Sequence, residues 1–284
     1  MPRTEENRFG GTSPPSYRAR VGDLFDAGAM YDADYLHFWD ASESLDDTAG
    51  YAVRTSPPGA DIDLIWRLLD LRPGMQVLDL ACGHGPLANR LAARGCRVTG
   101  LDSSTVFLDR ARADAKDLGV EVDYVVGDMR DLPWENQFDR IVNWSTAFGY
   151  FDDTENRRVV DQISRALRPG GRLIMDLNNL IGRLVSFEPS RIAVRDDGDM
   201  LADRFRLAPL TTRLEVERTI VRDGRSRRVQ FVVRLFGFPE LRDWLLAAGL
   251  DGISAYGEDG TGLRAHHDRM IVVAERTQSP GETH

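Results

Sequence analysis

Two carboxylates and two glycines, set at a characteristic spacing, indicate the chemistry that this sequence could perform. Asp79 precedes Gly83 and Gly85 in VLDLACGHGPLANRLA at 77–92, and Asp102 follows 19 residues after Gly83. Glycines at this spacing permit a sharp turn between a strand and a helix, and they let a ligand lie against main-chain N–H groups. A carboxylate at the position of Asp102 can hold both hydroxyls of an adenosine ribose. The pattern therefore predicts a cradle for an adenosyl ligand.

The charge of Asp79 discriminates between two kinds of adenosyl ligand. An anion fixed about 4 Å from a pyrophosphate costs roughly 1 kcal/mol in water and several at a lower effective dielectric, so Asp79 disfavours NAD. A ligand with a positively charged amino acid end is attracted instead. At residues 79–85, DLACGHG, the chain resembles motif I of class I methyltransferases that use S-adenosylmethionine (SAM), whose pattern is acid-x-x-x-Gly-x-Gly. The resemblance implies SAM as the cofactor and methyl transfer as the activity.

The resemblance covers roughly residues 61–184 and 239–274. It implies an α/β fold with a Rossmann-like, seven-stranded, mostly parallel sheet and an antiparallel last strand. Ligands of such sheets bind outside the carboxyl ends of the strands. Gly127-Asp128-Met129 resembles the family motif after the third strand, which implies that Asp128 reads the adenine amino group and Met129 covers the ring. The expected cofactor-binding residues are Tyr31, Tyr35, Trp39, Asp79, Ala81, Gly83, Gly85, Asp102, Ser103, Asp128, Met129 and Asn143, and no metal ligand is expected.

Aromatic residues are concentrated in YDADYLHFW at 31–39, ahead of the cradle. This run resembles the N-terminal tyrosine segment of small-molecule methyltransferases such as the sugar N-methyltransferases. Aromatic faces attract sulfonium and ammonium cations, and tyrosine hydroxyls stay available for hydrogen bonds. We therefore expect Tyr31, Tyr35 and Trp39 to form a lid over the cofactor. Short helices that only pack on the core are the alternative.

Methyl transfer needs in-line placement of donor and acceptor more than it needs a base. A base matters when the acceptor is a protonated amine or an unactivated hydroxyl. An antiparallel last strand would bring His266 and His267 to the active-site edge, whereas His84 is expected to shape the cradle. FGYF at 148–151 resembles a segment of bacterial small-molecule methyltransferases, which implies a nitrogen or oxygen of a metabolite as acceptor. The catalytic candidates are therefore His266, His267 and Tyr150.

Residues 187–235 leave the alternation of strands and helices. Two alternating apolar runs flank Arg222-Asp223-Gly224-Arg225, which is a hairpin signal. We expect an inserted antiparallel sheet that either walls the acceptor pocket or forms an oligomer surface. The expected organisation is a flexible tail at 1–20, a helical lid at 21–60, the SAM-binding Rossmann-like core at 61–186, the inserted sheet at 187–235, the end of the core at 236–276 and a tail at 277–284.

Composition narrows the choice of partners. The net charge is -9 without any block of like charge, which favours a small-molecule substrate over a nucleic acid. No apolar run approaches the roughly 18 residues of a membrane span, and residues 1–20 lack the apolar core of a signal peptide. Cys82 and Cys96 give neither a disulfide framework nor a zinc spacing, which favours the reducing cytoplasm. A homodimer is left open.

Three other classes of protein share some of these motifs. An NAD-dependent oxidoreductase would keep the glycines and Asp102, although Asp79 counts against it. An enzyme that cleaves or cyclises SAM would keep every motif and differ only in its product. A binding subunit without catalysis would also keep the cradle. Incubation with SAM and a panel of metabolites separates these classes by the product formed.

Overall fold

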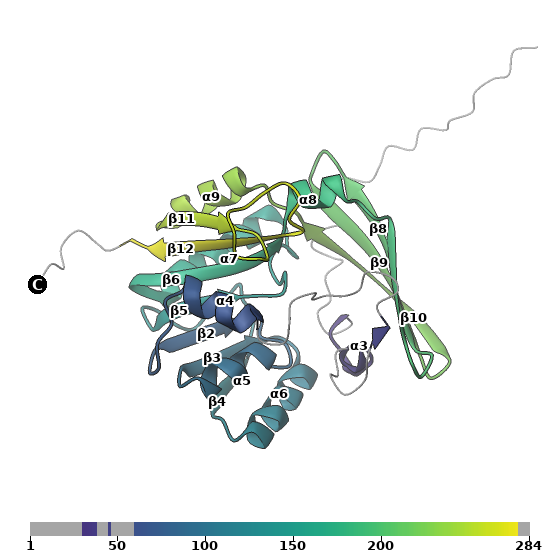
Figure 1. The fold of residues 1–284 in the computed structure, drawn as a ribbon, viewed down its shortest axis with the longest axis horizontal. Helices are drawn as coiled ribbons and strands as arrows, with labels where there is room; N and C mark the ends of the chain where they lie inside the picture. The colour runs from purple at the N-terminus through teal and green to yellow at the C-terminus, as the bar shows by residue number, and fades with distance from the viewer. Residues whose placement is uncertain (1–29, 39–44, 47–59, 278–284) are drawn as a thin grey trace, which may run out of the picture.

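A computed structural model describes residues 30–38, 45–46 and 60–277 of the chain. Seven of its strands form one sheet in the order β11-β12-β6-β5-β2-β3-β4 (Figure 1). Antiparallel pairs join β12 to β6 and β11 to β12. The other neighbours pair in parallel, so the predicted sheet with its antiparallel last strand is confirmed. The strands are β2 (Gln76–Leu80), β3 (Arg97–Asp102), β4 (Val122–Val126), β5 (Phe138–Asn143), β6 (Leu167–Asn178), β11 (Leu250–Tyr256) and β12 (Arg269–Arg276).

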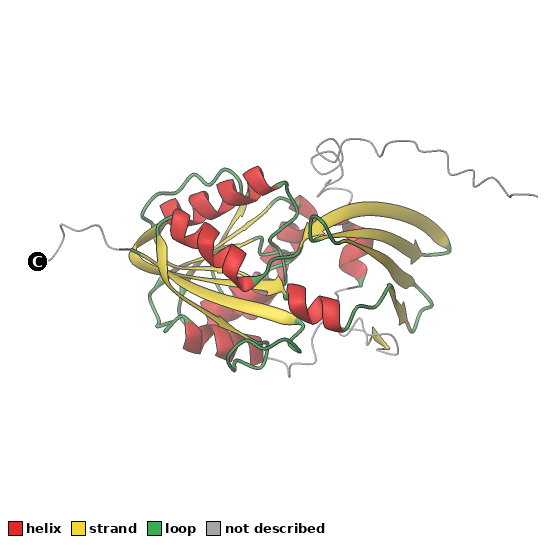
Figure 2. Ribbon diagram, turned by 90° about the horizontal axis from the view of Figure 1, so that it is seen from above, coloured by secondary structure: helices red, strands yellow, loops and turns green. Residues whose placement is uncertain are grey.

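Helices cover both faces of this sheet (Figure 2). Side chains of α4, α5 and α6, such as Leu91 and Leu108, belong to one cluster of buried apolar residues. Side chains of α7 and α9, such as Ile163 and Leu245, belong to another. The helices are α4 (Ala60–Leu68), α5 (Pro86–Ala93), α6 (Thr105–Leu118), α7 (Asp153–Ala166) and α9 (Phe238–Ala247). Because helices occupy both faces, the carboxyl ends of the parallel strands are the natural place for a ligand.

The sequence predicts helix caps at Ser103 or Ser104 and within residues 152–154, and polar residues at these positions do cap the helices. The Ser104 hydroxyl accepts the Phe107 N–H (3.3 Å) at the start of α6, and Gly119 ends that helix with a left-handed φ of 67°. The Asp152 carboxylate accepts the Glu155 N–H (2.8 Å) at the start of α7. No helix within the described part of the chain is long and apolar enough to cross a membrane.

Two elements differ from the sequence-based expectation. The sequence Arg168-Pro169-Gly170-Gly171 predicts a turn that ends a helix before a strand at 172–177, but β6 already begins at Leu167, which is buried and pairs with Phe138. A register shift between Phe138 and Arg140 accommodates the additional residues. The short helix α8 (Leu180–Val185) was not predicted; the Asn179 side chain caps it by accepting the Ile181 N–H (3.2 Å).

The inserted antiparallel sheet is present and has more strands than the two apolar runs indicated. β9 (Arg213–Arg222) and β10 (Arg225–Arg234) form the predicted hairpin, with left-handed φ at Asp223 (50°) and Gly224 (71°). Two left-handed central residues are what a tight two-residue hairpin turn requires. The sheet continues through β8 (Met200–Ala208) and β7 (Ser190–Arg195) to the two-residue strand β1 (Leu45–Asp46).

Residues 30–38, here called the aromatic segment, lie between α6 and the inserted sheet (Figure 1). Within it, α3 (Ala33–His37) begins at Asp32, whose carboxylate accepts the Tyr35 N–H (3.0 Å). The predicted lid residue Trp39, the tail at 1–20 and the rest of the C-terminal tail after Thr277 lie outside the described residues.

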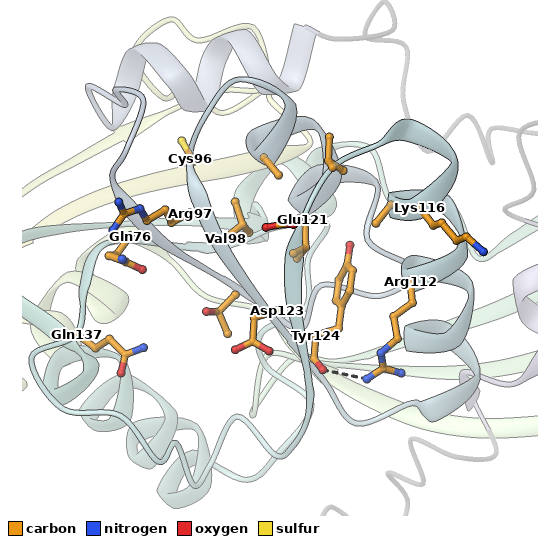
Figure 3. A pocket seen from close by; sticks show the side chains of 15 residues that line it. Gln76, Cys96, Arg97, Val98, Arg112, Lys116, Glu121, Asp123, Tyr124 and Gln137 are labelled. Atoms are coloured by element: carbon orange, nitrogen blue, oxygen red, sulfur yellow. Dashed lines mark hydrogen bonds between the residues drawn. The ribbon is translucent and has the colours of Figure 1, made fainter.

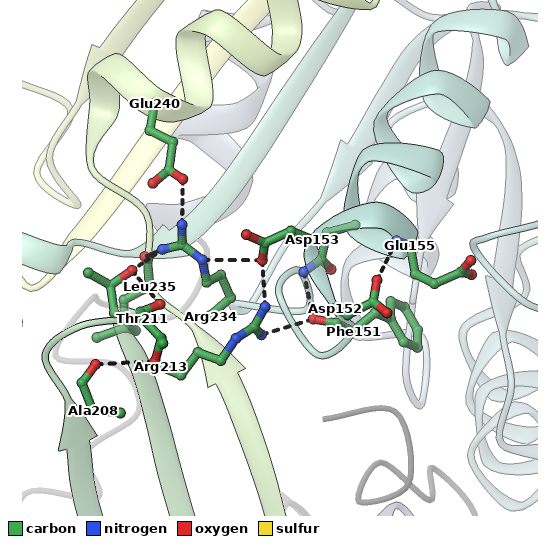
Figure 4. A network of polar contacts seen from close by, with 12 residues as sticks. Phe151, Asp152, Asp153, Glu155, Ala208, Thr211, Arg213, Arg234, Leu235 and Glu240 are labelled. Atoms are coloured by element: carbon green, nitrogen blue, oxygen red, sulfur yellow. Dashed lines mark hydrogen bonds and ion pairs between the residues drawn. The ribbon is translucent and has the colours of Figure 1, made fainter. Parts of the chain in front are cut away.

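Two buried arginines anchor the inserted sheet to the core (Figure 4). Arg213, the first residue of β9, donates to the Phe151 carbonyl (3.1 Å) and pairs with Asp153 at the start of α7. Arg234, the last residue of β10, pairs with the same Asp153 (3.4 Å) and with Glu240 of α9. The arginine side chains are only 4% and 8% exposed, so Asp153 compensates two largely buried charges.

The change Asp153→Ala is expected to lower the free energy of unfolding by about 2–4 kcal/mol, because it leaves two guanidinium groups short of a partner. Chemical denaturation measures this value. Glu215→Ala is the matched control, since Glu215 also pairs with an arginine of the inserted sheet but on its exposed surface, where the loss is expected to stay within about 1 kcal/mol. Equal losses in the two variants would contradict the anchoring role.

Candidate functional site

The turn after β2 uses backbone conformations that side chains rarely adopt. Ala81, Gly83 and Gly85 have φ values of 60°, 58° and 79°. A Cβ on Gly85 would lie 2.2 Å from the Tyr124 hydroxyl oxygen, so a larger residue does not fit there. Gly85 is also the N-cap of α5 and has no side chain with which to cap it; of the first N–H groups of this helix, that of Ala88 bonds the Asp79 carboxylate. Such N–H groups can bind polar atoms of a ligand, as expected for the cradle.

Asp102, at the end of β3, holds the cradle from the neighbouring strand. Its carboxylate accepts the N–H groups of Gly83 (2.8 Å) and Ser104 (2.9 Å), and the Ser103 backbone adds a further hydrogen bond. Burial raises the pKa of Asp102, and these backbone hydrogen bonds oppose the rise. Because each carboxylate oxygen can accept more than one hydrogen bond, Asp102 can shape the turn and still receive ribose hydroxyls.

Asp79 is buried in β2 with one carboxylate oxygen unpaired. The residue is 2% exposed, and its Oδ2 atom has no hydrogen-bond partner among the described residues. Burial, and to a lesser degree the charge of Asp102, raises the pKa of Asp79 to about 7, although the Ala88 N–H opposes this by hydrogen bonding. A positively charged ligand group would supply the missing partner, as the sequence argument requires.

Asn143, the last residue of β5, has a second buried side-chain oxygen without a hydrogen-bond partner among the described residues. β5 lies next to β2, with Val142 opposite Asp79 in the register, and Asn143 is the following residue. Its Nδ2 donates to the Leu80 carbonyl (3.0 Å), while Oδ1 is buried without a hydrogen-bond partner in the described chain. β3 and β4 follow β2 on one side of the sheet, whereas β5 lies on the other side of β2. The junction of β2 and β5 is therefore the topological switch point, where doubly wound sheets bind ligands. The orphaned Asp79 oxygen at this junction fits the ammonium group of SAM, whereas the Asn143 side chain points to the other face of the sheet, since Val142 shares the face of Asp79.

Asp128 and Met129 follow β4 as expected, but Asp128 already has a partner. Arg130 contacts both carboxylate oxygens, with Nη2 at 2.6 Å from Oδ2 and Nε at 3.0 Å from Oδ1. Partial burial raises the pKa of Asp128, but the hydrogen bonds and charge of Arg130 outweigh it and leave the pKa below the usual value. Asp128 is therefore ionised at neutral pH and can accept an adenine amino hydrogen, while the partly buried Met129 packs on the core.

The aromatic segment contacts the cradle side of the core through Tyr31. The Ser104 hydroxyl donates to the Tyr31 carbonyl (2.7 Å), and the Tyr31 ring meets the edge of Phe107 at 5.8 Å. The Tyr31 hydroxyl donates to the Tyr150 hydroxyl (3.1 Å) in the loop after β5. Tyr35 stacks on Phe107, with centroids 6.4 Å apart and planes 6° apart. The structure thus brings Tyr31, Tyr35 and Tyr150 together above the end of β3.

The two loop histidines have different surroundings. His267 is 3% exposed; its Nδ1 accepts the Arg264 N–H (3.0 Å) and its carbonyl accepts Nδ2 of Asn179 (2.7 Å). These contacts fasten the loop before β12 to the start of α8. His266 is exposed, and its ring lies 4.5 Å from that of His267. The half-buried His84 faces the edge of Phe107 at 6.1 Å, as a residue that shapes the cradle would.

The buried ion pair of Asp176 and Arg269, which was not predicted from the sequence, holds the start of the loop after β5 in place. Ser145 and Thr146 both have left-handed φ values, 60° and 56°, at a cost of order 1–3 kcal/mol each. Asp176 of β6, fully buried, accepts the Ser145 N–H (2.8 Å) and two N–H groups of Arg269 (2.8 and 2.5 Å). Arg269 also covers the Trp144 ring at 5.1 Å. An acid inside the apolar run LIMDL was the available signal.

Three residues outside the cradle have the atoms and spacing of a metal site. His37 Nε2 lies 3.0 Å from an Asp199 oxygen and 3.3 Å from an Asp197 oxygen. The Arg195 side chain, 1% exposed, contacts the same Asp197 oxygen at 3.5 Å and donates to the His37 carbonyl (3.0 Å). Arg195 therefore joins the aromatic segment to the β7–β8 turn, through its hydrogen bond to the His37 carbonyl and its ion pair with Asp197.

A hollow lies at the opposite edge of the sheet from the cradle, where the parallel strands begin (Figure 3). Gln76, Arg97 and Val122 line it, and they are the first residues of β2, β3 and β4. Arg112 points along its wall and donates to the Tyr124 carbonyl (2.9 Å). Since ligands of doubly wound sheets bind at the opposite, carboxyl ends of the strands, this hollow carries no part of the site.

Known proteins agree with this geometry. A family model described as a methyltransferase domain matches residues 77–171. The cypemycin N-terminal methyltransferase of a Streptomyces species is 30% identical over 218 residues, which cover 72% of this chain and 84% of that protein.

Solved structures share the fold. An S-adenosylmethionine-dependent methyltransferase from Clostridium acetobutylicum ATCC 824 has a TM-score of 0.68 at 18% identity, covering 78% of this chain and 93% of that one. The sugar N-methyltransferase KedS8 from Streptoalloteichus sp ATCC 53650 has a TM-score of 0.61 at 22% identity, covering 80% and 91%. Sequence similarity over most of both chains, the fold and the cradle together show that this chain belongs to the class I SAM-dependent methyltransferases.

Proposed function

We propose that the protein methylates a nitrogen or oxygen of a small metabolite, and that the Tyr31 and Tyr150 hydroxyls orient the acceptor. The observation that carries this proposal is the hydrogen bond between these hydroxyls, which joins the aromatic segment to the loop after β5. The name of the sugar relative specifies nitrogen as the atom that is methylated, and that of the cypemycin relative specifies the N-terminus as the place of methylation. A net charge of -9 supports a small acceptor over a nucleic acid, and the two buried free cysteines support a reducing cytoplasm.

The residues of the cradle suit the parts of SAM. When bound, SAM supplies a methyl group activated by its sulfonium charge. The Asp79 carboxylate would hold the ammonium group, Asp102 would receive the ribose hydroxyls, and Asn143 stays a predicted cofactor contact at the end of β5. Asp128 and Met129 would contact the adenine. The glycine turn would let the ligand lie against the main chain at the start of α5.

The tyrosine pair suits orientation better than proton abstraction. Burial raises the pKa of Tyr31 well above its usual value and also raises the pKa of Tyr150, although the Tyr31 hydrogen bond opposes the second shift. Both hydroxyls therefore stay protonated near neutral pH, where they can hold an acceptor by hydrogen bonds. In the transfer, the acceptor lone pair forms a bond to the methyl carbon, the carbon–sulfur bond breaks, and the acceptor later releases its proton. An amine acceptor must then bind in its neutral form.

Mass spectrometry of the protein incubated with SAM and a panel of amines, amino sugars and hydroxylated metabolites tests the proposal. The expected result is one added methylene unit on an acceptor, with an equal amount of S-adenosylhomocysteine. Consumption of SAM without a methylated product would instead indicate an enzyme that cleaves or cyclises SAM. Tighter binding of NAD than of S-adenosylhomocysteine in calorimetry would also contradict it.

The pKa of Asp79 makes cofactor binding depend on pH. The ionised fraction of a carboxyl with a pKa of about 7 rises from roughly a tenth at pH 6 to nine tenths at pH 8, so the Kd of S-adenosylhomocysteine is expected to fall about tenfold over this range. Calorimetry measures the change. Asp79→Asn should bind weakly and without this pH dependence, whereas the exposed control Asp131→Asn should follow the natural protein.

The same raised pKa has the opposite effect on stability without ligand. In the unfolded chain Asp79 ionises near pH 4, whereas the folded protein keeps its proton until about pH 7. The folded state therefore binds more protons in between, and its free energy of unfolding falls as the pH rises. Asp79→Asn is expected to raise the melting temperature of the unliganded protein at pH 8. A lower melting temperature would contradict the burial of an unpaired carboxylate.

Tyr150→Phe removes one hydroxyl and is expected to lower kcat by roughly 10–100-fold, since the acceptor loses an orienting contact, while S-adenosylhomocysteine affinity stays within about threefold. Steady-state kinetics and calorimetry measure the two effects. Tyr31→Phe should behave alike, because the two hydroxyls form one pair. His266→Ala is the comparison: if it alone lowers kcat strongly, a loop histidine is the base and the tyrosine assignment is wrong.

A further inference from the structure

A buried ion pair crosses the inserted sheet where stability alone gives little reason for it. Arg218 of β9 donates to both oxygens of Asp203 on β8, with Nε to Oδ1 at 2.8 Å and Nη2 to Oδ2 at 2.7 Å. The two residues are only 8% and 2% exposed. Taking two charges out of water costs several kcal/mol per ion, and apolar residues of similar volume often stabilise a fold equally well. The contacts of the pair therefore indicate its role.

Arg218 faces the aromatic segment. Its guanidinium carbon lies 4.7 Å from the centre of the Tyr35 ring and 5.1 Å from that of Phe231 on β10. A cation over an aromatic face is attracted by about 0.5–2 kcal/mol, depending on how far it is desolvated. Asp203 fixes the direction of the guanidinium through two parallel hydrogen bonds. The ion pair thus presents a rigid flat cation to the Tyr35 ring.

Tyr35 transmits this contact to the cradle. Its ring stacks on Phe107 of α6, as described above. The Phe107 ring in turn packs against the glycine turn, because a Cβ atom on Gly83 would lie 3.7 Å from it. The Tyr35 ring also meets Tyr31 edge to face at 5.5 Å. Arg218, Tyr35 and Phe107 therefore form one line of contact from the inserted sheet to the glycine turn, with Tyr31 beside it.

We propose that Arg218, oriented by Asp203, is a positioning residue for methyl transfer that acts through Tyr35 to hold the Tyr31–Tyr150 pair above the cradle. This inference rests on the proposed function. It gives the inserted sheet a part in the reaction beyond that of a wall, because loss of the guanidinium would release the aromatic segment on the acceptor side. The cradle itself, built from β2, β3 and α5, would remain intact.

The sheet contains its own control. Arg206 and Glu215 pair across the same two strands, β8 and β9, and they are also directly opposite each other in the register. Their side chains are 75% and 41% exposed, in contrast to the buried pair. Replacing both members of either pair by apolar residues removes one cross-strand ion pair without leaving a lone charge. The double variants Asp203→Leu/Arg218→Met and Arg206→Met/Glu215→Leu are therefore matched.

The experiment compares these double variants in kinetics with the acceptor found in the panel. For Asp203→Leu/Arg218→Met we expect a cooperative melt within a few degrees of the natural protein, S-adenosylhomocysteine affinity within threefold and a kcat at least 30-fold lower. The control pair should keep kcat within twofold. A kcat within threefold of the natural value in the buried-pair variant would overturn the proposal.

A thermodynamic cycle tests whether the effect passes through Tyr35. In a Tyr35→Ala background, the buried-pair change should lower kcat by less than threefold more, because the contact that it acts through is already absent. A further full 30-fold loss would show that Arg218 acts independently of Tyr35, and would overturn the proposal.

Hydrogen exchange gives a readout that needs no acceptor. With S-adenosylhomocysteine bound, amides of residues 30–38 should exchange at least tenfold faster in Asp203→Leu/Arg218→Met than in the natural protein or the control pair. Unchanged exchange there would overturn the positioning role even if no acceptor were methylated. Absence of methyl transfer by the natural protein, with the exchange difference present, would instead reject the acceptor class and leave Arg218 as the holder of the aromatic segment.

Discussion

The site depends on the hydrogen bonds that the Asp102 carboxylate accepts from the backbone. One bond, from the Gly83 N–H, holds the glycine turn against the end of β3, and another, from the Ser104 N–H, fixes Ser104, which is the N-cap of α6. The Ser104 hydroxyl in turn donates to Tyr31, whose own hydroxyl reaches Tyr150. Hydrogen bonds to a carboxylate are stronger than neutral ones, so this residue can organise several chain segments at once. A residue expected only to hold ribose is also the structural centre of the cofactor and acceptor sides.

The unfavourable electrostatic energy of a buried carboxylate without a cationic partner occurs at Asp79, where a bound cationic ligand would remove it. Asp79 is buried in the sheet with one carboxylate oxygen that has no hydrogen-bond partner among the described residues. Its raised pKa shows that the folded protein holds this charge at a disadvantage, which a cationic ligand would remove. Two acids buried elsewhere in the described chain are matched by arginines: Asp176 by Arg269, and Asp203 by Arg218. The contrast separates a position that lacks a partner until a ligand binds from positions whose partners belong to the chain itself.

Local signals explain what could be predicted from the sequence. The cradle, the helix caps at Ser104 and Asp152, and the Asp223-Gly224 hairpin each lie within a few residues, where backbone geometry constrains the residue type directly. The parallel order followed from a motif with known topology. The pairs Asp176–Arg269 and Asp203–Arg218 were missed, because their members are 93 and 15 residues apart and each looks like an ordinary strand residue.

The histidines show the limit of arguing from topology. An antiparallel last strand does bring the loop at 257–268 to the correct edge, but topology gives no information on which side chains the loop uses to fold itself. His267 occupies the space beside Gly257, where a Cβ would come within 2.3 Å of its ring, and its Nδ1 already accepts a backbone N–H. An imidazole packed in this way stabilises its own loop. The role of His266, which is exposed beside it, stays a prediction.

The inserted sheet is fixed at two places, and this arrangement bears on how acceptors could change while the cradle stays the same. At one end Arg213 and Arg234 tie the ends of the β9–β10 hairpin to α7 and α9. Further along β9, Arg218 contacts the aromatic segment rather than the Rossmann-like core. The strands between these two fixed places belong to a different sheet from β2 and β3, and their residues do not supply the Gly83 and Ser104 hydrogen bonds to the Asp102 carboxylate. If the inserted sheet walls the acceptor pocket, which stays a prediction, its residues could change the acceptor preference while the hydrogen bonds that hold the glycine turn stay the same.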